Sequence, residues 1–243
     1  MQPLAVAHRG TPLRHPENTL ASFRNALALG CDAIEFDVQW TLDEIPVVYH
    51  DRTLAQAGGG RKRVHQLTHR ELRRLKTRYP IPTLEQTLRL LHGKTALMIE
   101  LKAREGLTAR ARHLALARTV ARMVEQLGDS AQSSILCFDA TMLAEVGETA
   151  PQLRRVLNVR PQMPGLAAKL RRAAPQVVCA DVRSLSGAFG RRVLRNDRQL
   201  WSFTCNRPQT VQRALDAGAS AIISDRVDWL IQHLTKHGRR AEA

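Results

Sequence analysis

The 243-residue sequence has few aromatic residues and no long apolar run. Phe, Trp and Tyr together make up 4% of it, too few for a surface that stacks the bases of a nucleic acid. No apolar stretch approaches the roughly 20 residues that a membrane-spanning helix needs, so we expect no transmembrane segment. The first residues also lack the charged-then-apolar pattern of a secretion signal, and we therefore expect a cytoplasmic protein.

Nucleotide-binding loops and paired cysteines are absent as well. No G-x-G-x-x-G or G-x-x-x-x-G-K-[ST] loop follows an early strand-like segment, which disfavours a doubly wound nucleotide-binding fold. The cysteines are far apart and form no C-x-x-C pair, so we expect buried, reduced thiols and neither zinc nor disulfides. They are Cys31, Cys137, Cys179 and Cys205.

Acidic residues are outnumbered: 22 Asp and Glu stand against 37 Lys and Arg, for a formal net charge of +15. Such a surface attracts phosphates and could hold a nucleic-acid backbone. The basic residues are spread along the whole chain, however, and aromatic residues are scarce. We therefore expect no specific nucleic-acid partner, and a catalytically inactive basic barrel that binds nucleic acid is the least favoured alternative.

Short apolar segments alternate with amphipathic ones and predict an α/β fold, a (β/α)8 barrel of TIM type, in one domain of residues 1–243. Strands are expected at residues 4–7, 33–38, 96–101, 134–138, 155–159, 176–180, 200–205 and 220–224. A segment with helical periodicity follows each of them. An extra extended piece at residues 45–51 indicates a small excursion, about residues 45–80, between the second strand and its helix. The tail from residue 236 onwards is expected to fray.

Three carboxylates fall on the predicted strands. Alternation places Glu35 and Asp37 on one face of the second strand, and Glu100 has a corresponding place near the end of the third. Inside a parallel barrel they would be buried, which costs several kcal/mol, by order of magnitude, unless positive charge compensates. If they converge, their oxygens suit one divalent cation, Mg²⁺ or Ca²⁺ with Mn²⁺ also possible. A salt-bridge cluster with Arg9 and Lys102 is the structural alternative.

Two histidines differ from the other seven because each ends an extended segment and precedes a charged residue. His8 and His50 could act as base and acid on opposite sides of one bond. Arg9 offers a planar fork for phosphate oxygens, and Lys102 offers a point charge. Together with a cation, these groups suit phosphoryl transfer.

Several longer stretches form a series along the chain. "HRG" is followed by "PENTLASFRNALALGCDAIEFDVQWTLDEIPVVYHD", and "QLTHREL", "IPTLEQTL", "IELK", "SFTCN" and "AIISDRVDWL" come after it. In residues and spacing, this series resembles the glycerophosphodiester phosphodiesterase family. The resemblance covers nearly the whole chain. It implies a TIM-type barrel with a small excursion after the second strand, and hydrolysis of glycerophosphodiesters to glycerol 3-phosphate and an alcohol.

Residue by residue, the resemblance implies specific roles. The implied metal ligands are Glu35, Asp37 and Glu100. The implied acid–base pair is His8 and His50, with Arg9 and Lys102 on the phosphate and Asn18 as a structural support. Phe203 stands where the family usually has a Trp near the substrate, so we expect it in the substrate pocket. Glu44, Cys205 and Val227 are further departures, none at a catalytic position.

We therefore expect an enzyme for a small-molecule glycerophosphodiester. The main alternative is a lysophospholipase D-like phosphodiesterase acting on lysophospholipids, which would need an apolar access route, for example near Trp40 or Trp201. The sequence leaves open which metal is used, which alcohol leaves and which histidine is the acid. It also leaves open whether water attacks directly or a cyclic phosphate forms, and what the oligomeric state is.

Overall fold

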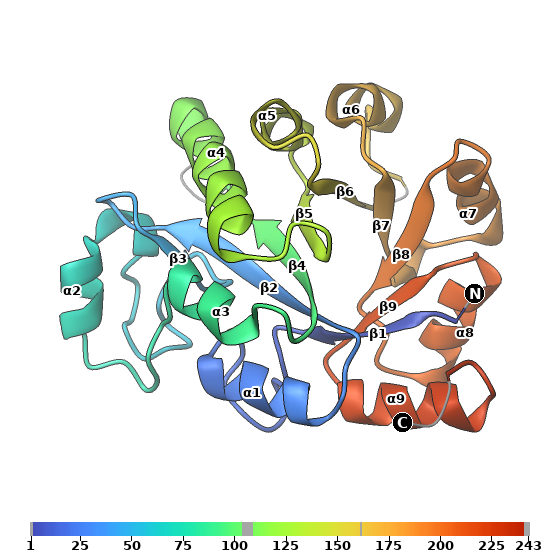
Figure 1. The fold of residues 1–243 in the computed structure, drawn as a ribbon, viewed down its shortest axis with the longest axis horizontal. Helices are drawn as coiled ribbons and strands as arrows, with labels where there is room; N and C mark the ends of the chain where they lie inside the picture. The colour runs from blue at the N-terminus through green and yellow to red at the C-terminus, as the bar shows by residue number, and fades with distance from the viewer. Residues whose placement is uncertain (1, 104–108, 161, 241–243) are drawn as a thin grey trace.

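The computed structural model describes residues 2–103, 109–160 and 162–240, and in these residues eight parallel strands close into a barrel (Figure 1). The ring closes because the first strand pairs with both the second and the last. The barrel strands are β1 (Leu4–His8), β2 (Ala33–Trp40), β4 (Ala96–Leu101), β5 (Ser133–Cys137), β6 (Arg154–Val159), β7 (Val177–Asp181), β8 (Gln199–Phe203) and β9 (Ala221–Ser224). The predicted TIM-type barrel is confirmed, with every strand end within two residues of its expected place.

Helices surround the barrel (Figure 1). Those that follow barrel strands are α1 (Leu20–Ala28), α3 (Leu84–Leu91), α4 (Arg110–Leu127), α5 (Ala140–Thr149), α6 (Leu166–Ala173), α7 (Gly187–Leu194), α8 (Pro208–Asp216) and α9 (Val227–Lys236). Local sequence sets several of their starts. Thr83 and Gln86, for example, form a reciprocal capping box at α3, because each side chain accepts a hydrogen bond from the other residue's backbone N–H.

The strands bury both faces, and their alternation divides the core in two. One set of side chains fills the barrel interior: Val6, Ala33, Met98, Leu136, Val156, Val177, Cys179, Trp201, Ala221 and Ile223. The other set packs between strands and helices. Two residues further along the interior face, Val6 gives way to His8, Ala33 to Glu35 and Met98 to Glu100. The same alternation that builds the core therefore carries ionisable groups to the mouth of the barrel.

Between β2 and α3 the chain makes the expected excursion. Strand β3 (Pro46–Val48) pairs antiparallel with β2, and a short 3-10 helix η1 (Val64–Gln66) and helix α2 (His69–Arg74) follow. The excursion has a small core of its own: Val47, Tyr49, Leu54, Ala57, Val64 and Leu72. It thereby forms a packed side wall next to β2, and His50 lies on it two residues after the end of β3.

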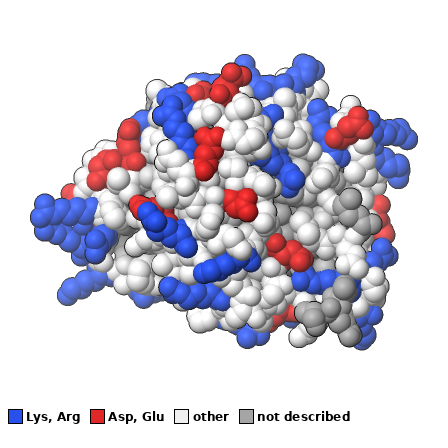
Figure 2. Space-filling model, viewed as in Figure 1, with Lys and Arg blue, Asp and Glu red and all other residues white. Residues whose placement is uncertain are grey.

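The surface and the chain end add three observations. Lys and Arg side chains are scattered over the face seen in Figure 2, with Asp and Glu among them. Within the described residues, no helix has the length and apolar character needed to cross a bilayer. The expectation of a frayed tail is wrong as far as residue 240, because the Arg240 guanidinium lies 2.5 Å from Asp32 and 2.7 Å from the carbonyl of Gly30.

Candidate active site

The three predicted carboxylates meet at the mouth of the barrel. Asp37 on β2 is in register with Glu100 on β4, and Glu35 lies two residues before Asp37 on the same face. One oxygen from each of the three lies within 4.8 Å of the others. All three are buried, with exposed fractions of 2%, 0% and 8% for Glu35, Asp37 and Glu100. We call them the carboxylate cluster.

Two cations neutralise one side of this cluster. The Lys102 ammonium lies 2.7 Å from Oδ1 of Asp37 and also pairs with Glu100. Nε of Arg9 lies 3.0 Å from Oδ2 of Asp37, and its Nη1 donates to Glu17. Burial opposes ionisation of Asp37, but Lys102 and Arg9 outweigh it and hold the pKa of Asp37 well below its usual range. The salt-bridge contacts weighed from the sequence therefore exist, and they centre on Asp37.

Glu35 is the member that these cations leave unmatched. Its Oε2 is buried and accepts no hydrogen bond from any described residue, and Nε2 of His8 lies 3.8 Å away. Burial and the charge of Asp37 raise the pKa of Glu35 to about 8. Burial also raises the pKa of Glu100, despite Lys102. An unmatched carboxylate oxygen among other carboxylates fits a hard divalent cation such as Mg²⁺ or Ca²⁺, so the residues present suit the predicted ion.

His8 is fixed from the far end of the chain. Its Nδ1 lies 2.5 Å from Oδ1 of Asp225, which follows β9, while Asn206 donates to the other oxygen of Asp225 at 2.6 Å. Because Nδ1 is engaged there, Nε2 faces Glu35. Burial alone would lower the pKa of His8, but the hydrogen bond to Asp225 and the charge of Glu35 raise it above the usual value.

His50 reaches the site from the excursion. Its Nδ1 lies 2.7 Å from Oδ1 of Asp51, and its side chain lines a cavity together with Glu100 and Lys102. Burial and the charges of Lys102 and Arg9 outweigh the nearby Asp37 and lower the pKa of His50 to about 4. The two predicted histidines thus come from different elements, one held by Asp225 and the other by Asp51.

The "HRG" turn has a backbone that few residues can adopt. Arg9 has φ +57° and Gly10 has φ +85°, both in the left-handed region. A Cβ on Gly10 would lie 2.3 Å from Oγ of Ser22. That hydroxyl instead donates to the carbonyl of Arg9 and accepts from the N–H of Thr11. Helix α1 therefore clamps the turn that carries His8 and Arg9.

Side-chain amides hold two of the carboxylates. Nδ2 of Asn18 donates to Oδ2 of Asp37 at 2.8 Å, and Oδ1 of Asn18 accepts from the Asp37 N–H. Nδ2 of Asn158 on β6 donates to Oε2 of Glu100 at 3.1 Å. Asn18 was expected as a support, whereas Asn158 and Asp225 were missed. The sequence does contain a sign of both. Asn158 lies two residues after the interior residue Val156 and therefore on the same face of β6, and Asp225 directly follows β9.

Phe203, the aromatic residue predicted in the substrate pocket, is connected to the site through a neighbouring aromatic ring. Phe203 ends β8 half-buried and stands edge-on to Phe138, with ring centroids 6.1 Å apart. Phe138 in turn lines the cavity that contains His50. Trp40 and Trp201 are 3% and 2% exposed, so neither forms an open apolar access route for an acyl chain.

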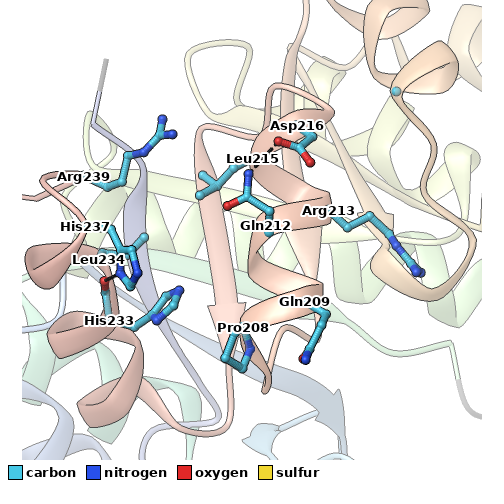
Figure 3. A pocket seen from close by; sticks show the side chains of 11 residues that line it. Pro208, Gln209, Gln212, Arg213, Leu215, Asp216, His233, Leu234, His237 and Arg239 are labelled. Carbon is cyan, nitrogen blue, oxygen red and sulfur yellow. Dashed lines mark hydrogen bonds between the residues drawn. The ribbon is translucent and has the colours of Figure 1, made fainter.

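Figure 3 shows the side chains of a different cavity, of about 780 Å³, between α8 and α9 on the outer layer of the barrel. Gln212 donates a hydrogen bond to Asp216 there, and Nδ1 of His237 lies 2.7 Å from the carbonyl of His233. None of the site residues predicted from the sequence lines this cavity, and we assign it no part in catalysis.

Comparison with known proteins gives one consistent result. The model of the glycerophosphoryl diester phosphodiesterase family matches residues 8–229. A glycerophosphodiester phosphodiesterase of Caldanaerobacter subterraneus subsp. tengcongensis is 27% identical over 98% of this chain and 100% of its own.

Solved structures show the same fold. A phosphodiesterase of Oleispira antarctica, in complex with the product sn-glycerol-3-phosphate, is 21% identical, covers 96% of this chain and 97% of its own, and has a TM-score of 0.85. A glycerophosphodiester phosphodiesterase of Thermotoga maritima is 19% identical, with 96% and 99% covered and a TM-score of 0.79. With a family match over most of its length and a barrel that carries the motif residues to one mouth, this chain belongs to the glycerophosphoryl diester phosphodiesterase family.

Proposed function

We propose that this chain hydrolyses glycerophosphodiesters to glycerol 3-phosphate and an alcohol, with one divalent cation and two histidines. The observation that carries the proposal is the buried carboxylate cluster of Glu35, Asp37 and Glu100, approached by His8 and His50. Family membership supports the reaction class, and the product bound to the Oleispira antarctica protein supports a glycerophosphate half of the substrate.

The carboxylate cluster would hold Mg²⁺ or Ca²⁺, with Mn²⁺ as a further candidate. When bound, such an ion supplies positive charge to phosphate oxygens and to an oxygen nucleophile or leaving group. Arg9 and Lys102 already lie at the cluster, where a guanidinium fork and an ammonium can both bind phosphate oxygens. In the substrate complex they would orient the diester and offset its charge.

The two histidines would move the protons. One takes the proton of the attacking hydroxyl, and the other delivers a proton to the departing alkoxide. Asp225 would orient the His8 ring, because it lies at Nδ1 while Nε2 faces Glu35. Asp51 would orient the His50 ring from its Nδ1. We further propose that residues 1–243 work as one catalytic domain, because the excursion of about residues 45–80 supplies His50.

The test is hydrolysis of glycerophosphocholine, read as release of glycerol 3-phosphate. We expect activity that EDTA abolishes and that Mg²⁺ or Ca²⁺ restores. His8→Ala and His50→Ala should each lower turnover at least ~10²-fold, as expected for proton carriers. The exposed His92→Ala is the matched control and should retain activity. Turnover that is indifferent to EDTA would refute the metal role.

The same assay separates the two enzyme hypotheses. Lysophosphatidylcholine carries the same head group as glycerophosphocholine and adds one acyl chain. Since Trp40 and Trp201 are buried, we expect the acylated compound to be the poorer substrate. Faster hydrolysis of lysophosphatidylcholine would favour the lysophospholipase D-like alternative.

A further inference from the structure

A cavity of about 750 Å³ opens beside the carboxylate cluster, with His50, Glu100 and Lys102 on its inner side. Its outer side comes from the segments that follow β5 and β6. The residues on that side include Phe138, Asp139, Arg160, Met163, Lys169 and Arg172. This volume suits a substituent of small-molecule size. The cavity is continuous with the reacting centre, so it would receive one half of a bound diester.

The outer side carries three cations that form no ion pair with any described residue. The guanidinium of Arg160 lies 6.0 Å from the ring centroid of Phe138, and Nζ of Lys169 lies 2.9 Å from Sδ of Met163. These are contacts with uncharged groups. Among the described residues, no carboxylate lies within ion-pair distance of Arg160, Lys169 or Arg172.

The negative charges around the cavity have other partners. Glu100 pairs with Lys102, and Oδ1 of Asp139 accepts the backbone N–H of Thr141 at the start of α5. Asp181, near Arg160, is held by Arg183, whose Nε donates to Oδ1 and whose Nη2 donates to Oδ2. The outer side of the cavity is therefore net positive.

Lys169 and Arg172 lie three residues apart on α6, which puts them on the same face of the helix. Arg160 follows β6, whose C-terminal end points to the barrel mouth. Side chains from two consecutive elements thus converge on one cavity. A quaternary ammonium would be less favoured there than an anionic group, and the cavity's aromatic ring, Phe138, already faces Arg160.

We propose that the alcohol half of the preferred substrate carries its own phosphate group, which Arg160, Lys169 and Arg172 bind. This inference rests on the proposed function and names the substrate class of that site. Arginine and lysine are suited to a phosphate monoester, which accepts several charge-assisted hydrogen bonds. Glycerol 3-phosphate would leave one side of the cluster, and the phosphorylated alcohol would leave through the cationic cavity.

The experiment compares glycerophosphoinositol with glycerophosphoinositol 4-phosphate, which differ only by one phosphate monoester. We expect the phosphorylated substrate to have a kcat/KM at least ~10-fold higher at low ionic strength, about the value of one charge-assisted contact. The ratio should fall as salt rises, because the cations are partly exposed. The double variant Lys169→Gln/Arg172→Gln should bring the ratio close to one.

Arg171→Gln is the matched control, because it removes a neighbouring charge on α6 that does not line the cavity. It should keep the wild-type ratio, and thermal melts of all variants check that the fold is intact. Equal kcat/KM for both substrates, or a ratio that survives the double variant, would overturn the inference while leaving the proposed function in place. If no glycerophosphodiester is hydrolysed at all, the proposed function fails and this inference fails with it.

Discussion

Replacing Glu35 by Gln should stabilise the metal-free protein and remove its response to metal. The reason is the unmatched Oε2, which is buried beside Asp37 with no hydrogen-bond donor among the described residues. In the unfolded chain this carboxyl ionises near pH 4.5, whereas in the metal-free fold it keeps its proton until about pH 8. The folded state therefore binds more protons between these values, and the free energy of unfolding falls as pH rises through this window.

The size of the effect follows from the two pKa values. Each pKa unit corresponds to about 1.4 kcal/mol, so ionised Glu35 destabilises the metal-free fold by on the order of 5 kcal/mol above pH 8. A neutral amide at the same place still costs about 2 kcal/mol, because its polar atoms stay without partners. The net gain for Glu35→Gln is about 3 kcal/mol. For a chain of this length, that corresponds to a rise in Tm of roughly 6–12 °C.

Differential scanning calorimetry at pH 9 measures both parts of this prediction. In EDTA, Glu35→Gln should melt above the wild type. When Mg²⁺ or Ca²⁺ is raised to 100 times its Kd, the wild type should gain about 2.7 kcal/mol and the variant much less. Glu17→Gln changes a carboxylate that pairs with Arg9 outside the cluster and should keep the metal response. A Glu35→Gln protein that melts below the wild type in EDTA, or that gains as much from metal, would refute the reasoning.

Three further outcomes are expected. In urea unfolding, Gly10→Ala should lower the free energy of unfolding by at least about 1 kcal/mol more than Gly60→Ala. Both glycines have positive φ, but only a methyl group at Gly10 would meet Ser22. Equal losses would contradict the clamping of this turn by α1. Trp201→Ala should cost about 3–5 kcal/mol, because it empties the barrel interior beneath the carboxylate cluster, and a loss under 1 kcal/mol would contradict that packing. All four thiols should react slowly with Ellman's reagent until the protein unfolds. The reason is that burial raises the pKa of Cys31, Cys137 and Cys205 to about 12, and that of Cys179 well above its usual value. Fast labelling of the native protein would speak against these buried positions.

Much of the fold could be predicted because its signals are local. The barrel strands are short apolar runs, and the period of two that places Ile34 and Phe36 against the helices also places Glu35 and Asp37 inside. The start of α3 was readable from Thr83 and Gln86. Helix α2 was not, because its six residues include a single buried one, Leu72, too little to show a period.

The missed parts depend on distant residues. Asp225 meets His8 across 217 positions, and nothing in the local sequence of either residue indicates the other. The same holds for Asn158 and Glu100, which lie 58 positions apart. The Arg240 contact with Asp32 opposed the local expectation of a frayed tail for the same reason. The local sequence pattern predicts which face of a strand a residue occupies and where the strand ends. Which distant residue it contacts is set by the closure of the barrel, and the local pattern does not contain that information.

The pairing of β1 with β9 brings Asp225 to His8, so the first and the last barrel strands complete the candidate site together. A growing polypeptide has made His8, Glu35, Asp37 and Glu100 long before it makes Asp225, so every shorter product lacks the carboxylate that orients the first histidine. Removing the last strand and helix would also strip β1 of one neighbour and open the ring. If the proposed roles of His8 and Asp225 hold, a chain that is terminated or cleaved before Asp225 should fold without this contact and should not hydrolyse the substrate.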